Sequence, residues 1–223
     1  MGLADTIMGL LAGRSWRVAS QAAAQPSQPL DYPAQIEVGG ETIDLRPMTG
    51  YDRTMMLEFA RSLPSHDLLF LRRDITRPQV IEEWAQAIEE DRYVTIIALR
   101  GTQIVGYSTV ASDGIDWTRH VAELRVLVSP SMRGLRLGRS LAEQAFSIAR
   151  QRGVRKTIAQ MTTDQRAAIH VFGHIGFEKE ARLRNQLIDR DGQLHDLQIM
   201  SLDVDEFRAK MDLMAINAEH EFV

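Results

Sequence analysis

Polar and apolar residues alternate along several short runs of the chain, and this alternation predicts β-strands. Residues 35–48 form two such runs around Gly39-Gly40, which predicts a hairpin with its turn at the glycines. Residues 92–110 predict a second hairpin around "RGT". Further strands are predicted at 120–128 and 156–161, and a last pair meets at "DRDGQ".

Other segments carry apolar residues three and four positions apart, which is helical spacing. They predict helices over 50–63, 77–92, 137–152 and 164–175, the last with Asp164 as its N-cap. The strand at 120–128, the helix after it and the strand at 156–161 require a parallel crossover. The pattern therefore predicts an α/β fold, with a mixed sheet of six or seven strands, a central parallel β-α-β crossover and flanking helices.

The ends of the chain lack the pattern of its centre. Residues 19–29 read "ASQAAAQPSQP", a composition that cannot bury a core and is typical of a linker. We therefore expect an N-terminal helical extension over 1–18, an Ala/Ser/Gln/Pro linker over 19–34, one domain over 35–204 and a C-terminal helical tail over 205–223.

Composition excludes several classes of function. The 223 residues include no cysteine, which rules out disulfides, thiolate catalysis and zinc held by cysteine. The formal net charge of −4 argues against a nucleic-acid partner. No run reaches the roughly 18 apolar residues of a membrane-spanning helix, and the N-terminus lacks the basic start of a signal peptide. We therefore expect no membrane partner and a cytoplasmic location.

One segment of this acidic chain is strongly basic. Residues 131–156 contain seven lysines and arginines and a single acid, so they carry a net charge of +6, whereas the whole chain carries −4. The segment begins "SMRGLRLGR", between a predicted strand and a predicted helix. The N–H groups of a helix start bind phosphate, glycine lets the backbone approach it, and arginine adds forked donors. The segment therefore predicts a site for a polyanionic ligand.

Two common phosphate-binding motifs fit these residues less well. A P-loop requires Gly-Lys-Ser/Thr at the helix start, and a dinucleotide fingerprint requires a third glycine beside Gly134 and Gly138. The structural alternative is that the arginines are simply solvated. Elsewhere, Asp189, Asp191 and His195 could suggest a metal, but "DRDGQ" is more typical of a hairpin turn, and no metal site is predicted.

These motifs, in this order, resemble the GNAT superfamily of acetyl-CoA-dependent N-acetyltransferases. Residues 133–138 resemble its pyrophosphate loop, Gln/Arg-x-x-Gly-x-Gly/Ala, with Arg136 where the middle glycine is usual. The hairpin "IALRGTQIVGYSTV", with Gly106, resembles the family's central pair of strands. The segment "DQRAAIHVFGHIGF" resembles the family's last helix with its Gly-Phe. The resemblance covers roughly residues 41–204.

The resemblance implies a GNAT fold and an enzyme that uses acetyl-CoA as co-substrate without a metal. It implies that Glu123 is the base that deprotonates the amine, if its strand splays from the neighbouring strand there. The alternative is a carboxylate that only pairs with Arg125 or His120. The residues implied to bind acetyl-CoA are Val126, Leu127 and Val128 through their backbone, Arg133, Gly134, Leu135, Arg136, Leu137, Gly138 and Arg139 at the pyrophosphate, and Gln165.

The family often protonates the departing thiolate with a tyrosine, and Phe172 stands at that position here. His170 or His174, on the same predicted helix, could replace the missing acid. Water could also supply the proton, or the thiolate could leave directly.

The acceptor amine is the least determined part of the prediction. The segments "LEFARSLPSHDLLFLRR" and "AELRVLV" resemble bacterial protein-lysine acetyltransferases, which modify enzymes such as acyl-CoA synthetases. We therefore expect a protein lysine as acceptor, with a small-molecule amine as the alternative. A third alternative is a CoA-binding module without catalysis, and a homodimer would be in keeping with the family. An open acidic groove would indicate a protein lysine, and a closed pocket a small amine.

Overall fold

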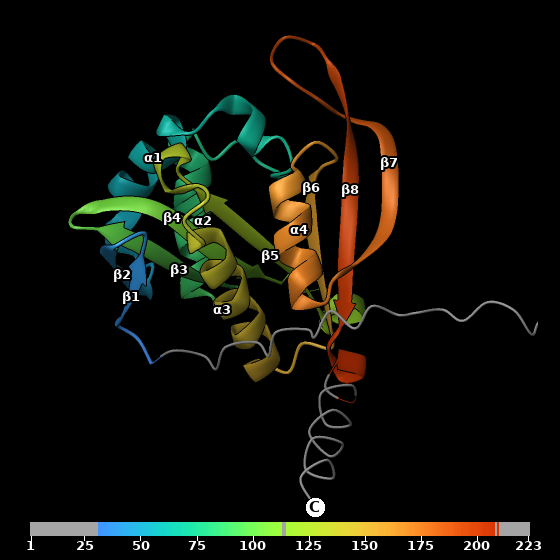
Figure 1. Ribbon diagram of the computed structural model, residues 1–223, viewed down its shortest axis with the longest axis horizontal. Helices are drawn as coiled ribbons and strands as arrows, with labels where there is room; N and C mark the ends of the chain where they lie inside the picture. Colours follow the sequence, from blue (N-terminus) through green and yellow to red (C-terminus); the bar gives the residue numbers. More distant parts are fainter. Residues whose placement is uncertain (1–30, 113–114, 208, 210–223) are drawn as a thin grey trace, which may run out of the picture.

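The computed structural model describes residues 31–112, 115–207 and 209. Its centre is one sheet of eight strands in the order β1-β2-β3-β4-β5-β6-β8-β7 (Figure 1). All neighbouring strands are antiparallel except β5 and β6, which run parallel. The predicted fold class is confirmed, and the sheet has one strand more than the expected maximum of seven.

The strands are β1 (Ala34–Val38), β2 (Glu41–Pro47), β3 (Tyr93–Arg100), β4 (Gln103–Ala111), β5 (Val121–Val128), β6 (Lys156–Thr162), β7 (Glu178–Ile188) and β8 (Leu194–Asp203). The helices are α1 (Arg53–Ser62), α2 (Pro78–Glu89), α3 (Leu137–Gln151) and α4 (Arg166–Ile175). Short 3-10 turns are η1 (Gly50–Asp52), η2 (Ser65–Leu68), η3 (Asp116–Thr118) and η4 (Pro130–Met132).

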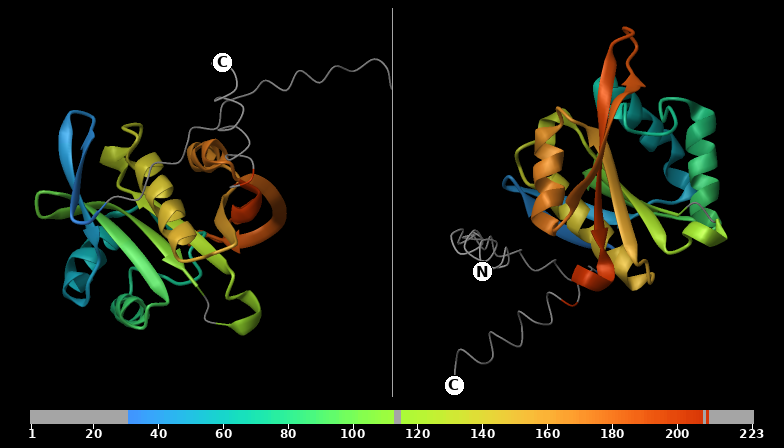
Figure 2. Two further views of the ribbon diagram at one scale, coloured as in Figure 1. Left: turned by 90° about the horizontal axis from the view of Figure 1, so that it is seen from below. Right: turned by 90° about the vertical axis from the view of Figure 1, so that its right-hand side faces the viewer.

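Helices cover both faces of the sheet (Figure 2). The apolar sides of α1 and α2 pack on one face through residues such as Phe59 and Trp84. The apolar sides of α3 and α4 pack on the other face through residues such as Phe146 and Phe172. Successive side chains of a strand point to opposite faces, so the odd-numbered residues of β5 face α1 and α2, and the even-numbered ones face α3.

The predicted hairpin turns are confirmed. Gly39 and Gly40 have φ angles of 61° and 84°, the left-handed backbone that a two-residue turn requires. In the turn between β7 and β8, the Asp189 side chain accepts hydrogen bonds from the N–H groups of Asp191 and Gln193 at 3.0 and 2.8 Å. The acidic residues of "DRDGQ" therefore form a turn, as the sequence indicated.

The starts of two helices differ from the prediction. Residues 50–52 form η1, so α1 begins only at Arg53. Helix α4 begins at Arg166 with Gln165 as N-cap, because the carboxylate of Asp164 is directed instead to His66, at 2.8 Å. The predicted N-terminal extension, most of the linker and most of the C-terminal tail lie outside the described residues. No helix in the described part of the chain is long and apolar enough to cross a membrane.

A β-bulge in β4 brings the sheet close to α3. The register between β3 and β4 shifts at this point, and Val105 is the extra residue. The carbonyl of Val105 accepts a hydrogen bond of 2.9 Å from the N–H of Ser129, at the end of β5. The bulge therefore fixes the place where the chain leaves β5 and enters the predicted pyrophosphate loop.

Gly106, beside the bulge, allows the close approach of α3. A Cβ atom there would lie 3.1 Å from both the Leu127 carbonyl oxygen and Leu141 Cδ1. We expect Gly106→Ala to lower the free energy of unfolding by about 1–3 kcal/mol, because the backbone oxygen cannot move aside. Urea unfolding followed by circular dichroism measures the change.

Gly173→Ala is the matched control. Gly173 lies within α4 with nothing near its missing Cβ, so alanine should instead stabilise the protein by about 0.5–1 kcal/mol. Equal effects of the two substitutions would show that the approach at Gly106 is not tight.

Candidate active site

The parallel pair of strands is short and then parts. Only residues 121–123 of β5 pair with residues 156–158 of β6, whereas β6 pairs with β8 on its other side along its whole length (Figure 1). Residues 124–128 of β5 keep β4 on one side and, in the described part of the chain, pair with no strand on the other. The expected splay after Glu123 is therefore present. An extended ligand can hydrogen-bond along such a strand edge.

Glu123 lies at the last paired position before the strands part, and it is only 6% exposed. Its Oε2 accepts a hydrogen bond of 2.7 Å from Arg125 Nη2, and Arg72 Nε lies 3.7 Å away. Its Oε1 is buried and receives no hydrogen bond from the described residues. Buried acceptors are nearly always satisfied, so a ligand or a water is the expected donor. Glu123 thus pairs with Arg125 and still keeps one oxygen for a further contact.

Arg125 is held between Glu123 and an aromatic ring. Its side chain is 15% exposed, and its guanidinium lies 5.6 Å from the centre of the Tyr93 ring. Burial acts to lower the pKa of Arg125, but the hydrogen bond and the charge of Glu123 outweigh it, and the pKa is raised. The guanidinium therefore stays charged beside the Glu123 carboxylate.

A pocket of about 390 Å³ lies on the α1–α2 side of the sheet and reaches both arginines that approach Glu123. Trp84 and Tyr107 form an aromatic part of its wall, with ring centres 4.9 Å apart and an edge-to-face arrangement. Four arginines line it, and acids pair with three of them: Glu83 with Arg73, Glu90 with Arg92 and Glu123 with Arg125. The lining residues are Leu71, Arg72, Arg73, Ile75, Val80, Glu83, Trp84, Gln86, Ala87, Arg92, Tyr93, Tyr107 and Arg125.

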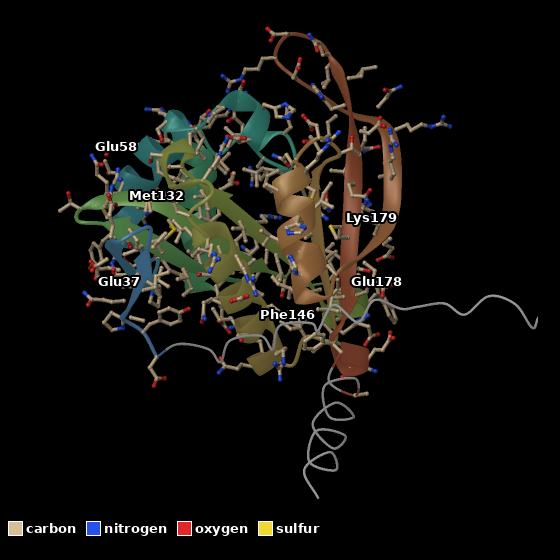
Figure 3. All side chains as sticks on the ribbon, viewed as in Figure 1. Glu37, Glu58, Met132, Phe146, Glu178 and Lys179 are labelled. Carbon is tan, nitrogen blue, oxygen red and sulfur yellow. The ribbon has the colours of Figure 1, made fainter. Side chains whose placement is uncertain are left out.

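The predicted pyrophosphate loop connects β5 to the start of α3. Met132 of η4 is buried and anchors the loop (Figure 3). Gly134 and Arg136 both have left-handed backbone, with φ of 75° and 73°. Glycine adopts this conformation freely, whereas for arginine it is strained. Arg136 is the N-cap of α3, so the N–H groups of residues 137–139 have no partner within the helix.

The three arginines of the loop have different surroundings. Arg133 forms an ion pair with Asp67 of η2. Arg139 Nε lies 2.8 Å from Glu143 Oε1, one turn further along α3. Arg136 is exposed and forms no ion pair within the described ranges. The loop therefore gathers basic side chains at one helix start, but acids of the protein already engage two of them.

The remaining predicted acetyl-CoA ligands line the same region. Leu127 is buried on the α1–α2 side, while Val126 and Val128 pack partly on the α3 side. Leu135 is 39% exposed and lies against Gly39 of the first hairpin. Leu137 and Gly138 begin α3, where a Cβ on Gly138 would make only an ordinary contact of 3.5 Å with Val128.

Gln165 stands at the end of β6, opposite the loop, and its Oε1 accepts a hydrogen bond of 3.2 Å from the Thr162 N–H. Phe172 points into the core, 5.0 Å from the ring of Phe177. His170 and His174 bond each other through Nε2 atoms 2.9 Å apart. Residues two positions apart on a helix point about 200° apart, so neither histidine takes the direction of Phe172.

The sequence analysis did not single out the arginines of the pocket or Asp67. Arg72 and Arg73 follow the apolar run "LLFL" in a segment without regular periodicity. Such a segment does not indicate where its side chains point. The signal in the sequence was the pair of adjacent arginines, which comes before the strand of Glu123 in the chain.

Comparison with known proteins identifies a family that matches this chain. The family model "Acetyltransferase (GNAT) family" matches residues 57–177, just over half of the chain. The matched region includes the loop, the fork between β5 and β6, and the Gly-Phe that follows α4.

Two curated proteins and one solved structure are informative relatives. The L-amino acid N-acyltransferase MnaT of Escherichia coli is 27% identical over 124 residues, which cover 55% of this chain and 72% of that protein. The L-methionine sulfoximine/L-methionine sulfone acetyltransferase of Salmonella typhimurium is 27% identical over 127 residues, covering 56% and 74%. The structure of yncA, a putative acetyltransferase from Salmonella typhimurium with acetyl-CoA, superposes with a TM-score of 0.64 at 21% identity, covering 73% and 94%.

The left-handed backbone of Arg136 gives a prediction about stability. We expect Arg136→Gly to raise the free energy of unfolding by about 1 kcal/mol, because glycine removes the strain of a positive φ. Arg136→Ala should give no such gain, since alanine keeps the strain and loses only an exposed side chain. Urea unfolding of both variants tests this, and equal stability of the two would show that the position is not strained.

Proposed function

Because the chain belongs to the acetyltransferase (GNAT) family, we propose that it transfers the acetyl group of acetyl-CoA to the amino group of a small acceptor of the amino-acid class. The single observation that carries this proposal is the position of Glu123. It lies where β5 and β6 part, in contact with arginines that line a pocket of about 390 Å³.

The fork and the loop together fit acetyl-CoA. The unpaired edge of β5 at residues 126–128 offers backbone donors and acceptors to the pantetheine arm. The start of α3 offers free N–H groups to the pyrophosphate, with Arg133, Arg136 and Arg139 nearby. Gln165 stands at the opposite side of the fork, at the start of α4. The arm would then bring the thioester towards Glu123.

The reaction needs a neutral amine, and amines of this class are protonated near pH 7. In the proposed mechanism, the carboxylate of Glu123 accepts a proton from the acceptor ammonium, directly or through one water. The amine nitrogen then attacks the acetyl carbon, a new C–N bond forms, the C–S bond of the thioester breaks, and the nitrogen loses its second proton to water or to the departing sulfur. The sulfur leaves as thiolate or takes a proton from water, because Phe172 supplies none.

The character of the pocket favours a small acceptor that carries a carboxylate. Arg72 and Arg125 approach Glu123 and also line the pocket, so a carboxylate held there would place an α-amine near the base. The expected protein-lysine acceptor is therefore less well supported than the small-molecule alternative, and the names of the two curated relatives agree with that alternative.

Glu123→Gln tests the proposed base. The change keeps the shape of the side chain and removes its ability to take a proton, so kcat should fall by about 10²-fold or more. The dissociation constant of acetyl-CoA, measured by calorimetry, should stay nearly constant. Because Arg125 loses its counter-ion, the variant should also unfold at a lower temperature.

The control for this test is Glu180→Gln. Glu180 also forms an ion pair, with Lys156 Nζ at 2.9 Å, but on the far strand β7. Its replacement should leave kcat unchanged. If Glu123→Gln retains full turnover while it remains folded, Glu123 is a structural partner of Arg125 and the base lies elsewhere.

A panel of acceptors tests the acceptor class. Free L-amino acids, their carboxamides and lysine-containing peptides are compared by the rate of CoA thiol release. We expect kcat/KM to fall by at least about tenfold from an amino acid to its carboxamide, because the charged contact with arginine is lost. The amine of the carboxamide is less basic than that of the amino acid. If the contact with arginine did not matter, the carboxamide would therefore react at least as fast as the amino acid. Lysine peptides that react as well as the best amino acid would contradict the proposal.

A further inference from the structure

Asp67 joins the loop for the pyrophosphate to the segment that forms the acceptor pocket. It lies in η2, between α1 and α2, and its carboxylate is hydrogen-bonded to Arg133. The Asp67 side chain is 14% exposed, whereas that of Arg133 is 49% exposed. The two residues are 66 positions apart in the sequence, so this contact is purely a product of the fold.

The neighbouring residue holds the other side of the fork. His66 Nε2 lies 2.8 Å from Asp164 Oδ2, in the turn between β6 and α4. The His66 ring also packs edge-on against His195 of β8, with ring centres 5.2 Å apart. Thus η2 contacts the loop after β5 through Asp67, and the turn after β6 through His66. In Figure 1 the segment between α1 and α2 crosses the top of the molecule towards α4.

The same segment continues directly into the pocket. Leu71, Arg72, Arg73 and Ile75 line it, and Arg72 approaches Glu123. The position of η2 therefore sets where these side chains lie. Asp67 and Arg72 are only five positions apart in the chain.

We propose that Asp67 is a positioning residue that couples acetyl-CoA binding to the acceptor pocket, by holding Arg133 until a pyrophosphate displaces it. The proposal rests on the function proposed above, in which Arg133 contacts the pyrophosphate. Without acetyl-CoA, the pair Asp67–Arg133 ties η2 to the loop. With acetyl-CoA, the guanidinium turns to the phosphate oxygens, η2 is released from the loop, and Arg72 and Arg73 move with it.

Electrostatics gives the direction of this exchange. A pyrophosphate that binds Arg133 at the start of α3 brings negative charge close to the carboxylate of Asp67. Like charges repel. Arginine binds phosphate oxygens through two parallel hydrogen bonds, so the phosphate competes effectively for the guanidinium. Acetyl-CoA must therefore break one ion pair before it gains the full contact with Arg133, and this reduces its apparent affinity.

Asp67→Asn tests the proposal, because asparagine keeps the shape and removes the charge. We expect CoA, titrated by calorimetry, to bind roughly fivefold more tightly to the variant, the factor that corresponds to losing a half-exposed ion pair. In the wild-type protein, CoA should raise amide hydrogen exchange in residues 65–74. In Asp67→Asn, exchange there should already be high without CoA, and CoA should change it little.

The matched control is Asp91→Asn. Asp91 forms the same kind of pair, with Arg152 Nη1 at 2.8 Å, but at the end of α3 away from the pyrophosphate loop. Its loss should leave CoA affinity and the exchange of residues 65–74 unchanged. Unchanged or weaker CoA binding by a folded Asp67→Asn variant would overturn the proposal, since the pair would then only orient Arg133.

Arg133→Gln separates failure of this proposal from failure of the proposed function. If Arg133 contacts the pyrophosphate, the variant binds CoA more weakly, and inorganic pyrophosphate competes less well with CoA. Weaker binding by Arg133→Gln without tighter binding by Asp67→Asn overturns only the coupling. Unchanged binding by Arg133→Gln overturns both the coupling and the role of Arg133 at the pyrophosphate.

Discussion

The parting of β5 from β6 after Glu123 is the feature on which the rest of the site depends. A strand inside a sheet uses its N–H and C=O groups on both sides, and no ligand can then bind along it. Here β6 diverges from β5 after Ile158 and stays paired with β8, so one edge of β5 is left for a ligand. The same divergence places a buried carboxylate at the apex of the fork. In the proposed mechanism, sheet topology therefore brings the acetyl donor and the base together.

The sheet needs stabilising contacts at the place where β5 and β6 part. The regular pairing of the strands does not supply these contacts. The bulge at Val105 holds the end of β5 through Ser129, and Gly106 lets α3 pack over it. The start of α3 is thereby fixed close to the end of β5. Arg136 accepts a strained backbone at that point, where the family usually has glycine. Its positive charge at the mouth of the loop offers a reason to tolerate the strain.

Local patterns in the sequence were enough to predict the sheet, the crossover helix and the loop. Alternation and helical spacing report which side of each element is buried, and left-handed turns favour glycine, as at Gly39 and Gly40. The helix starts were less accurate, because Asp164 has a long-range partner in His66 that no local rule reveals. Asp67 and Arg72 could not be predicted for the same reason. They lie in a segment without periodicity, and their partners are 66 and 51 positions away in the chain.

The acceptor shows why resemblance of short segments is a weak guide to substrate. The segments that resemble protein-lysine acetyltransferases include "AELRVLV", whose alternate residues face the two cores, and such positions report packing. In the proposed function, the side chains around Glu123 select the substrate instead. Arg125 cannot leave Glu123 without leaving a buried charge unpaired, so this ion pair beside the acceptor pocket is a fixed feature of the fold. A carboxylate on the acceptor could accept hydrogen bonds from the arginines that line the pocket, and its amino group would then lie near Glu123.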